Sequence, residues 1–175
     1  MSASPLRAVS AHADVPHAPG VILETETPAV GVLIEHDQRR LIALEPIRAG
    51  TEIFRIEGRV TGTPTRYSIQ VGLGQHLDPD DAPTAMDRVR TRYWMYLNHH
   101  CAPSAWVRDR MVVALRDIAP GDGVTFDYNT TELEMASPFD CHCLSASCVG
   151  LVRGAKHLTE SQRARIASCV ATYLR

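Results

Sequence analysis

The sequence has no long apolar run and no apolar leader. Its longest apolar stretches, such as Ala29–Ile34, are only a few residues long, whereas a membrane-spanning helix needs roughly 20 apolar residues in succession. Residues 1–20 also lack the basic start and apolar run of a signal peptide. We therefore expect no membrane association and an intracellular location, which would be the cytoplasm in a bacterium.

An excess of positive charge is also missing. The formal net charge at pH 7 is −2 and the sequence pI is about 6.4. Proteins that bind nucleic acids present a broad basic field to the phosphate backbone. We therefore expect no nucleic-acid partner. The sequence carries no signal for an oligomeric state.

The composition is typical of one globular domain. The chain has 175 residues, of which 45% are apolar and 22% are charged; both the length and the composition fit a single folded domain. Residues 1–20 are mostly small, contain prolines and show no apolar period. They are expected to form a flexible leader.

Short apolar or alternating runs, each followed by Gly, Pro or Asp, predict a mainly β core of short strands and tight turns. The expected strands lie within Val30–Ile34, Leu41–Leu44, Glu52–Ile56, Tyr67–Leu73 and Met111–Leu115.

Two segments are predicted to be helical. The stretch Asp78–Arg92, acidic first and then basic, is expected to be a loop that leads into a short helix near Tyr93–Leu97. At the C-terminus, Leu158–Leu174 carries apolar residues at helical spacing and starts with a capping box of Thr159 and Gln162. This segment is predicted to be a C-terminal helix.

Three of the five cysteines fall within eight residues, in the pattern C-H-C-x4-C: Cys141, Cys143 and Cys148. This spacing suits a loop that wraps around one tetrahedral metal ion. A fourth ligand is then required, and the candidates are Cys101, Cys169 and His142. Cys169 lies beside the apolar stripe of the expected C-terminal helix, so Cys101 is the better candidate.

Three motifs, in the same order, resemble those of SET-domain methyltransferases. Tyr96–Ser104 (YLNHHCAPS) resembles R-F/Y-x-N-H-S-C-x-P-N, and Asp117–Tyr128 (DIAPGDGVTFDY) resembles D-I-x-x-G-E-E-L-T-F-D-Y. Cys141–Gly150 (CHCLSASCVG) is similar to the C-terminal C-x-C-x4-C-x-G of the family. Weaker similarity at Leu41–Phe54 and Tyr67–Leu77 extends the resemblance over about residues 30–155.

The resemblance implies a mainly β, β-clip-like fold of short curved sheets with a threaded C-terminal segment. Threading would place Asn98–His99 beside Phe126–Tyr128. It also implies a SET domain over residues 21–137, a zinc-binding post-SET segment over 138–155 and the C-terminal helix over 156–175.

The resemblance also implies the cofactors, S-adenosylmethionine and a structural zinc ion. Zinc would be held by all four cysteines of the family pattern, Cys101, Cys141, Cys143 and Cys148. The cofactor contacts would come from Arg40, Tyr96, Asn98 and His99. A tetrahedral site closed by four thiolates has no open coordination position and is structural.

Tyr128 matches the catalytic tyrosine of the family, and Tyr67 and Phe126 match residues that line the channel for the substrate amine. Phenylalanine at position 126 implies room for more than one methyl group. From the residues alone, other roles are open: the Tyr128 hydroxyl could cap a backbone group, Asn98–His99 could form an ordinary turn, and both channel aromatics could be core residues.

One departure concerns the cofactor. Where the family has G-x-G, this chain has Gln38-Arg39-Arg40, and replacing glycine removes a close approach of the backbone. Arg39 and Arg40 could instead pair with the cofactor carboxylate, or be solvated turn residues.

The expected function is methyl transfer to a lysine side chain of a protein, and the acidic run Asp78–Asp87 could attract a basic peptide. Two alternatives remain. One is an enzyme that uses S-adenosylmethionine on a small amine or amino-acid-like molecule in biosynthesis. The other is an inactive zinc-stabilised binding module, which the missing G-x-G would favour.

Overall fold

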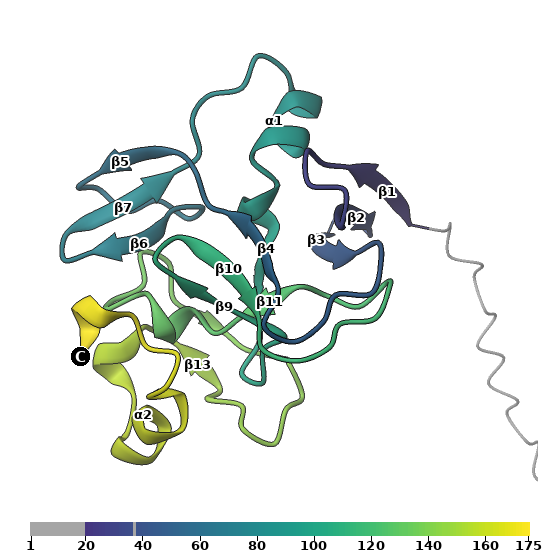
Figure 1. Cartoon of the computed structure of the whole chain (residues 1–175). Helices are drawn as coiled ribbons and strands as arrows, with labels where there is room; N and C mark the ends of the chain where they lie inside the picture. The colour runs from purple at the N-terminus through teal and green to yellow at the C-terminus, as the bar shows by residue number, and fades with distance from the viewer. Residues whose placement is uncertain (1–19, 37) are drawn as a thin grey trace, which may run out of the picture.

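The computed structural model describes residues 20–36 and 38–175, so the expected leader lies, apart from Gly20, outside the described residues. The described part is built from many short strands and few helices, as the sequence predicts (Figure 1). The strands are β1 (Val21–Glu24), β2 (Val30–Glu35), β3 (Gln38–Ala43), β4 (Glu52–Arg55), β5 (Arg59–Thr61), β6 (Ile69–Gly72), β7 (Gln75–Asp78), β8 (Asn98–His99), β9 (Ala105–Arg108), β10 (Met111–Ala114), β11 (Thr125–Phe126), β12 (Phe139–Asp140) and β13 (Leu151–Val152). The α-helices are α1 (Ala85–Thr91) and α2 (Glu160–Ile166), and the 3-10 helices are η1 (Tyr93–Tyr96), η2 (Tyr128–Thr130), η3 (Ala155–His157) and η4 (Thr172–Leu174).

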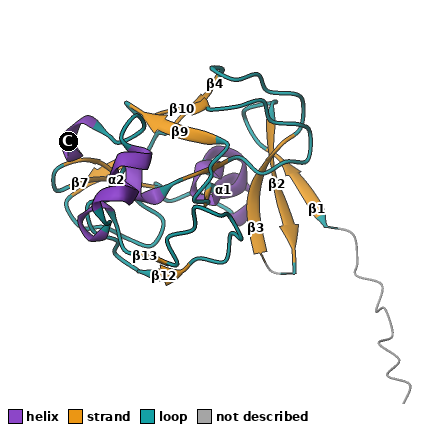
Figure 2. Ribbon diagram, turned by 90° about the horizontal axis from the view of Figure 1, so that it is seen from below, coloured by secondary structure: helices purple, strands orange, loops and turns teal. Residues whose placement is uncertain are grey.

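The strands of the described residues assemble into five small sheets. Three antiparallel sheets have the orders β1-β2-β3, β4-β10-β9 and β5-β7-β6, and β12 pairs with β13. The remaining sheet is the parallel pair β8 and β11. The β1-β2-β3 sheet and helix α2 lie at opposite ends of the molecule (Figure 2). The loops between the sheets carry most of the motifs singled out in the sequence.

The core lies where these sheets meet. Aliphatic side chains of β2, β3 and β10, such as Val32, Leu41 and Val112, are fully or almost fully buried and pack in one cluster with Trp94. The indole nitrogen of Trp94 donates a hydrogen bond to the carbonyl of Glu57 at 2.9 Å. The largest core side chain is therefore both packed and satisfied in its polar atom.

All five expected strands are present within a few residues of their expected limits. The expectation of a loop over Asp78–Arg92 is wrong in its second half, where α1 forms. The Thr84 side chain caps α1 by accepting a hydrogen bond from the backbone N–H of Asp87 at 3.1 Å. The short helix expected near Tyr93–Leu97 is present as the 3-10 helix η1.

The C-terminal helix is much shorter than predicted. The capping box of Thr159 and Gln162 is present, but α2 ends at Ile166. Beyond it the chain returns to the core: the N–H of Ala171 donates to the carbonyl of Thr130 at 2.8 Å, and the Tyr173 hydroxyl donates to the carbonyl of Gln70. A continuous helix would project away from these acceptors.

The described residues contain no helix that is both long enough and apolar enough to cross a bilayer.

Gly154 fixes how the chain after the cysteine loop crosses the segment before it. Its φ of +103° is a conformation that other residues rarely adopt, and a Cβ atom there would lie 2.6 Å from the carbonyl oxygen of Leu133. Its N–H donates to the side-chain oxygen of Asn129 at 3.2 Å. This crossing has no room for a side chain.

We expect Gly154→Ala to lower the free energy of unfolding by at least about 3 kcal/mol, from backbone strain and the clash together. Gly50→Ala is the matched control, because Gly50 also has positive φ (+82°) but a Cβ there would meet no atom within 4 Å. Strain alone should cost about 1–2 kcal/mol at Gly50. Urea unfolding of both variants measures the difference, and equal losses would contradict the clash.

Candidate functional site

The parallel pair of β8 and β11 brings the two central motifs together. Asn98 lies opposite Thr125 and His99 opposite Phe126, and the N–H of His100 donates to the Phe126 carbonyl at 3.1 Å. Asn98–His99 and Phe126–Tyr128 are therefore neighbours, as the resemblance implied. Ser104 secures the pair, since its hydroxyl donates to the Gly123 carbonyl at 2.8 Å and accepts from the Thr125 N–H at 2.9 Å.

A cavity of about 700 Å³ opens beside this pair. Its wall comes from β3, from the Thr65–Ile69 segment, from η1 and β8, and from the chain between Phe126 and Phe139. The predicted site residues that line it are Tyr67, Tyr96, Asn98, His99, Phe126 and Tyr128. The volume is within the usual range of roughly 300–1,000 Å³ for small-molecule sites.

Tyr128 lies against this cavity in an aromatic cluster. Its ring centroid is 4.8 Å from that of Phe126 and 6.0 Å from that of Phe139. Its hydroxyl donates to the carbonyl of Leu97 at 2.7 Å. Burial, and secondarily the charge of Glu132, raise the pKa of Tyr128, so the phenol stays protonated at neutral pH. Tyr128 thus both caps a backbone carbonyl and lines the cavity.

The His99 ring is buried, with its side chain only 2% exposed. Burial, and then the neighbouring His100, lower its pKa to about 4, so the imidazole is neutral. Its Nδ1 accepts the backbone N–H of Tyr128 at 3.2 Å, and its Nε2 lies 3.2 Å from the Cys101 sulfur. With Nδ1 as acceptor, the proton is on Nε2 and points at the sulfur. The imidazole therefore lies between Cys101 and the backbone of Tyr128.

The four predicted cysteines converge. The sulfur atoms of Cys101, Cys141, Cys143 and Cys148 all lie within 4.8 Å of one another. A tetrahedral ion with metal–sulfur bonds of about 2.3 Å would separate its sulfurs by ~3.8 Å, and the Cys101–Cys141 separation is 3.9 Å. Backbone N–H groups of Val149 and Gly150 point at two of the sulfurs. The donor set and spacing fit one tetrahedral metal ion, and neither Cys169 nor His142 belongs to the cluster.

The two arginines of the segment that replaces the G-x-G pattern line different cavities. Arg39 lines the main cavity, and its carbonyl accepts a hydrogen bond from the Asn98 side chain at 3.1 Å. Arg40 lines a second, smaller cavity and its guanidinium pairs with Glu35 at 3.5 Å. Successive strand residues face opposite ways, so Arg39 rather than the predicted Arg40 is placed to contact a molecule in the main cavity.

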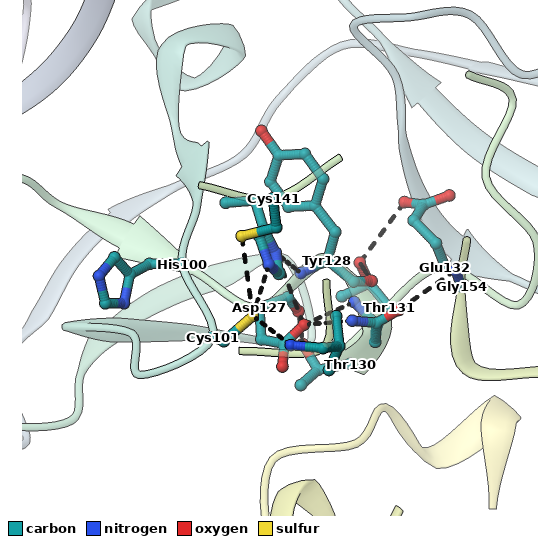
Figure 3. A network of polar contacts seen from close by, with 12 residues as sticks. His100, Cys101, Asp127, Tyr128, Thr130, Thr131, Glu132, Cys141 and Gly154 are labelled. Carbon is teal, nitrogen blue, oxygen red and sulfur yellow. Dashed lines mark hydrogen bonds and ion pairs between the residues drawn. The ribbon is translucent and has the colours of Figure 1, made fainter. Parts of the chain in front are cut away.

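Sequence reasoning missed Glu132 and Phe139, which also line the main cavity. The only signal for Glu132 is an acidic residue shortly after F-D-Y, and Phe139 stands two residues before the first cysteine of the cluster. Burial raises the pKa of Glu132 to about 7, although the N–H of Gln70 donates to its carboxylate at 2.7 Å. Figure 3 shows the Glu132 side chain projecting to the same side of the chain as the Tyr128 ring.

Comparison with known proteins agrees with these features. The SET-domain family model matches residues 38–129. The chain is 36% identical over 132 residues to "Methyltransferase flvH" of Aspergillus flavus, covering 73% of this chain and 66% of that protein. It is 33% identical over 129 residues to a histone-lysine N-methyltransferase, H3 lysine-4 specific, of Kluyveromyces lactis, covering 64% of this chain and 13% of that protein. A histone-lysine N-methyltransferase, H3 lysine-36 specific, of Yarrowia lipolytica is 31% identical over 144 residues.

The fold matches that of a solved protein, KRYPTONITE. The TM-score is 0.52 at 18% sequence identity, with 69% of this chain and 28% of that chain covered. Its crystal structures hold S-adenosylhomocysteine (SAH) and methylated DNA, and one also holds the H3(1-15) peptide. The likeness shows the mainly β SET-domain fold. The chain spans about two thirds of the flvH protein and less than a fifth of each histone-lysine relative.

Proposed function

Because the chain belongs to the SET-domain family, we propose that it is an S-adenosylmethionine-dependent methyltransferase that methylates the side-chain amine of lysine in a protein. One observation carries the proposal: a protonated tyrosine hydroxyl and the Asn98–His99 pair border the same cavity. These two features are 29 residues apart in sequence, between His99 and Tyr128, and the β8–β11 pairing brings them together, with the Tyr128 N–H donating to the His99 ring and the Tyr128 hydroxyl donating to the Leu97 carbonyl.

The residues around the cavity fit the cofactor. S-adenosylmethionine, when bound, supplies a methyl group on a positively charged sulfur. At one side of the cavity Arg39 can pair with a carboxylate, and Asn98 and Tyr96 add amide and hydroxyl groups that suit a nucleoside. Arg39 thus supplies charge within the segment where the family pattern has G-x-G.

Tyr128 would orient the reacting amine. Because its hydroxyl donates a hydrogen bond to the Leu97 carbonyl, its oxygen lone pairs are available to accept a hydrogen bond from an amine N–H. Holding two reactants about 3 Å apart and in line contributes several kcal/mol to lowering a barrier. Phe126, with no hydroxyl, leaves the neighbouring wall apolar, which is consistent with addition of more than one methyl group.

A small amine is the second candidate substrate, and a specific observation favours it. Two of the four acidic residues expected to attract a basic peptide are paired with arginines of the chain: Asp78 lies 3.8 Å from Arg59, and Asp80 lies 3.6 Å from Arg92. The side chain of Asp87 accepts from the Thr84 hydroxyl at 2.7 Å. Half of the negative charge of this run is therefore compensated within the chain.

We also propose that the ion of the cysteine cluster is zinc and that its role is structural. All four ligands are cysteines, the set that zinc occupies as a closed tetrahedral site. The cluster joins Cys101, just after β8, to the segment that follows Met135–Phe139, and residues 135–139 supply one wall of the cavity. Zinc would therefore hold this wall against the core.

Calorimetric titration of the zinc-loaded protein with S-adenosylmethionine tests the cofactor. We expect binding that Asn98→Ala weakens about tenfold, a loss of about 1.4 kcal/mol, and that Arg39→Ala weakens as well. Arg40→Ala should bind almost as tightly as the wild type, since that guanidinium faces Glu35. If the wild-type protein does not bind S-adenosylmethionine, the methyltransferase function is contradicted and the inactive zinc-stabilised binding module is favoured.

Methyl transfer to histone peptides, to Nα-acetyl-lysine amide and to free amines tests the reaction. Tyr128→Phe should lower kcat by roughly 100-fold or more, the usual effect of losing one positioned hydrogen-bonding group at a reacting centre, while cofactor affinity is kept. Tyr93→Phe is the control, because that hydroxyl bonds to Thr27 away from the cavity. Undiminished transfer by Tyr128→Phe would contradict the assigned role. Transfer to free amines but not to peptides selects the small-molecule substrate.

Removal of the metal should unfold the chain after Phe139, because binding energy at such sites is also folding energy. Cys143→Ser is expected to lose stoichiometric zinc and to lose hydrogen-exchange protection over residues 139–153. Cys169→Ser, which alters a thiol outside the cluster, should keep both. Metal content by atomic emission and exchange by mass spectrometry give the answer, and a Cys143→Ser protein with a full zinc content would refute the four-cysteine site.

A further inference from the structure

Glu132 places a buried carboxylate in the wall of the main cavity. Its side chain is only 8% exposed, and it lines the cavity together with Tyr67 and Tyr128. The backbone N–H of Gln70 donates to one carboxylate oxygen at 2.7 Å and the Thr131 hydroxyl lies 3.4 Å from the same atom. The position of the group is therefore fixed, and its second oxygen makes no such hydrogen bond within the described residues.

No strong cation of the described residues neutralises this carboxylate. The nearest basic group is His76 on β7, with Nε2 4.0 Å from the second carboxylate oxygen. Burial lowers the pKa of His76, and its Nδ1 has no hydrogen-bond partner. The imidazole is therefore neutral at pH 7. Lys156, the single lysine of the chain, pairs with the exposed Glu134 at 3.1 Å instead.

None of the other described groups that face Glu132 is a cation in contact with its carboxylate. Tyr128 on η2 and Tyr173 on η4 are phenols whose own pKa values are raised by burial and then by the charge of Glu132. β6 contributes the Gln70 backbone. Arg66 also lines the cavity, but no ion pair joins it to Glu132. An ionised carboxylate without a counter-ion is costly to bury, and a cation that entered the cavity would lower this cost.

We propose that Glu132 binds the ammonium group of the substrate and accepts its proton before methyl transfer. The substrate class is then a primary or secondary alkylammonium ion, whether it ends a lysine side chain or a small molecule. The inference rests on the proposed function, because it assigns a base to that reaction.

The step balances as follows. The carboxylate of Glu132 takes a proton from R–NH₃⁺, giving R–NH₂ and the neutral carboxylic acid. The nitrogen lone pair of the amine then forms the new N–C bond to the methyl carbon of S-adenosylmethionine. The S–C bond breaks and its electron pair stays on sulfur, giving S-adenosylhomocysteine and R–NH₂⁺–CH₃. The acid returns its proton to solvent for the next turnover.

Such a base addresses the main difficulty of amine methylation near neutral pH. A lysine amine has a pKa near 10.4, so only about one molecule in a thousand is neutral at pH 7. A general base positioned at the reacting group contributes about 100- to 10,000-fold to rate. Because burial raises the pKa of Glu132 to about 7, its carboxylate is a stronger base than an exposed glutamate and is still substantially ionised near neutrality.

The test compares Glu132→Gln with Glu134→Gln over pH 6 to 10. Glutamine keeps an oxygen for the Gln70 N–H but cannot take a proton. With either alkylammonium substrate, the wild-type kcat/KM should rise with pH through the ionisation of Glu132 near pH 7 and then level off. Glu132→Gln should be roughly 100-fold slower at pH 7, and its deficit should shrink toward pH 10, where free amine is plentiful. Glu134→Gln, which changes an exposed carboxylate paired with Lys156, should follow the wild type.

Glu132→Asp distinguishes the loss of the carboxylate from damage to the fold, because its side chain keeps a carboxylate and is one methylene shorter. It should keep the rise of rate near neutral pH at a reduced level, and thermal unfolding should show all three variants folded. A Glu132→Gln enzyme with wild-type kcat/KM and pH profile would overturn the proposal while leaving the methyltransferase function standing.

A second measurement decides the matter if the wild type methylates none of the amines. Calorimetric titration with n-butylammonium chloride, in the presence of S-adenosylhomocysteine, tests ammonium recognition without turnover. Binding by the wild type and by Glu134→Gln, with a loss of at least tenfold in Glu132→Gln, would support recognition by Glu132 even though the proposed function had failed. Equal binding by all three proteins, or none, would overturn it.

Discussion

Two residues of β11 hydrogen-bond in parallel with two residues of β8, and the site depends on that short pairing. Parallel strands cannot be joined by a tight turn, and here the connection contains the β9–β10 hairpin and the loop that follows it. A two-residue ladder is too short to hold itself, so Ser104 and the buried core around Val124 and Phe126 must fix it. The cavity, Tyr128 and the cysteine cluster all border on the same pair.

His99 makes the metal site and the tyrosine parts of one arrangement. Its neutral ring accepts the N–H of Tyr128 on one side and points its other nitrogen at the sulfur of Cys101. A donor aimed at a thiolate stabilises the charge that a metal ligand carries. A change at the cluster therefore acts on the backbone of Tyr128 through one rigid ring, as well as through the wall that ends in Phe139. A metal ion held by the cysteine cluster and the proposed reacting centre at Tyr128 would therefore not be independent in this fold.

The sequence predicts best what depends on local patterns. Short apolar and alternating runs located five of the strands, β2, β3, β4, β6 and β10, and cysteine spacing with the N-H-x-C motif located all four members of the cluster. The length of α2 could not be read from its apolar stripe. The helix ends at Ile166, and beyond it Ala171 donates to the carbonyl of Thr130 and Tyr173 to the carbonyl of Gln70. From the sequence, the cofactor contact is assigned to Arg40, because a motif does not show which side of a strand a residue faces. The register of β3 does show it, and Arg39 lies on the side of the main cavity. Glu132 escaped because its burial arises from contacts with Gln70, 62 residues away.

The distribution of charge around the cavity bears on which part of a substrate is recognised. On the surface the acidic side chains Asp78 and Asp80 face arginines of the same chain, so these two add little field to select the residues that flank a target lysine. Inside, Glu132 keeps its carboxylate at the cavity wall with no resident cation of comparable strength among the described residues. A charge interaction is stronger in such a site than in water. The electrostatic part of recognition therefore falls on the amine itself rather than on its surroundings, and one cavity of this design suits a lysine side chain and a small alkylamine on the same physical grounds. A protein substrate and a small alkylamine would then be distinguished by shape and by contact area outside the cavity mouth rather than by charge.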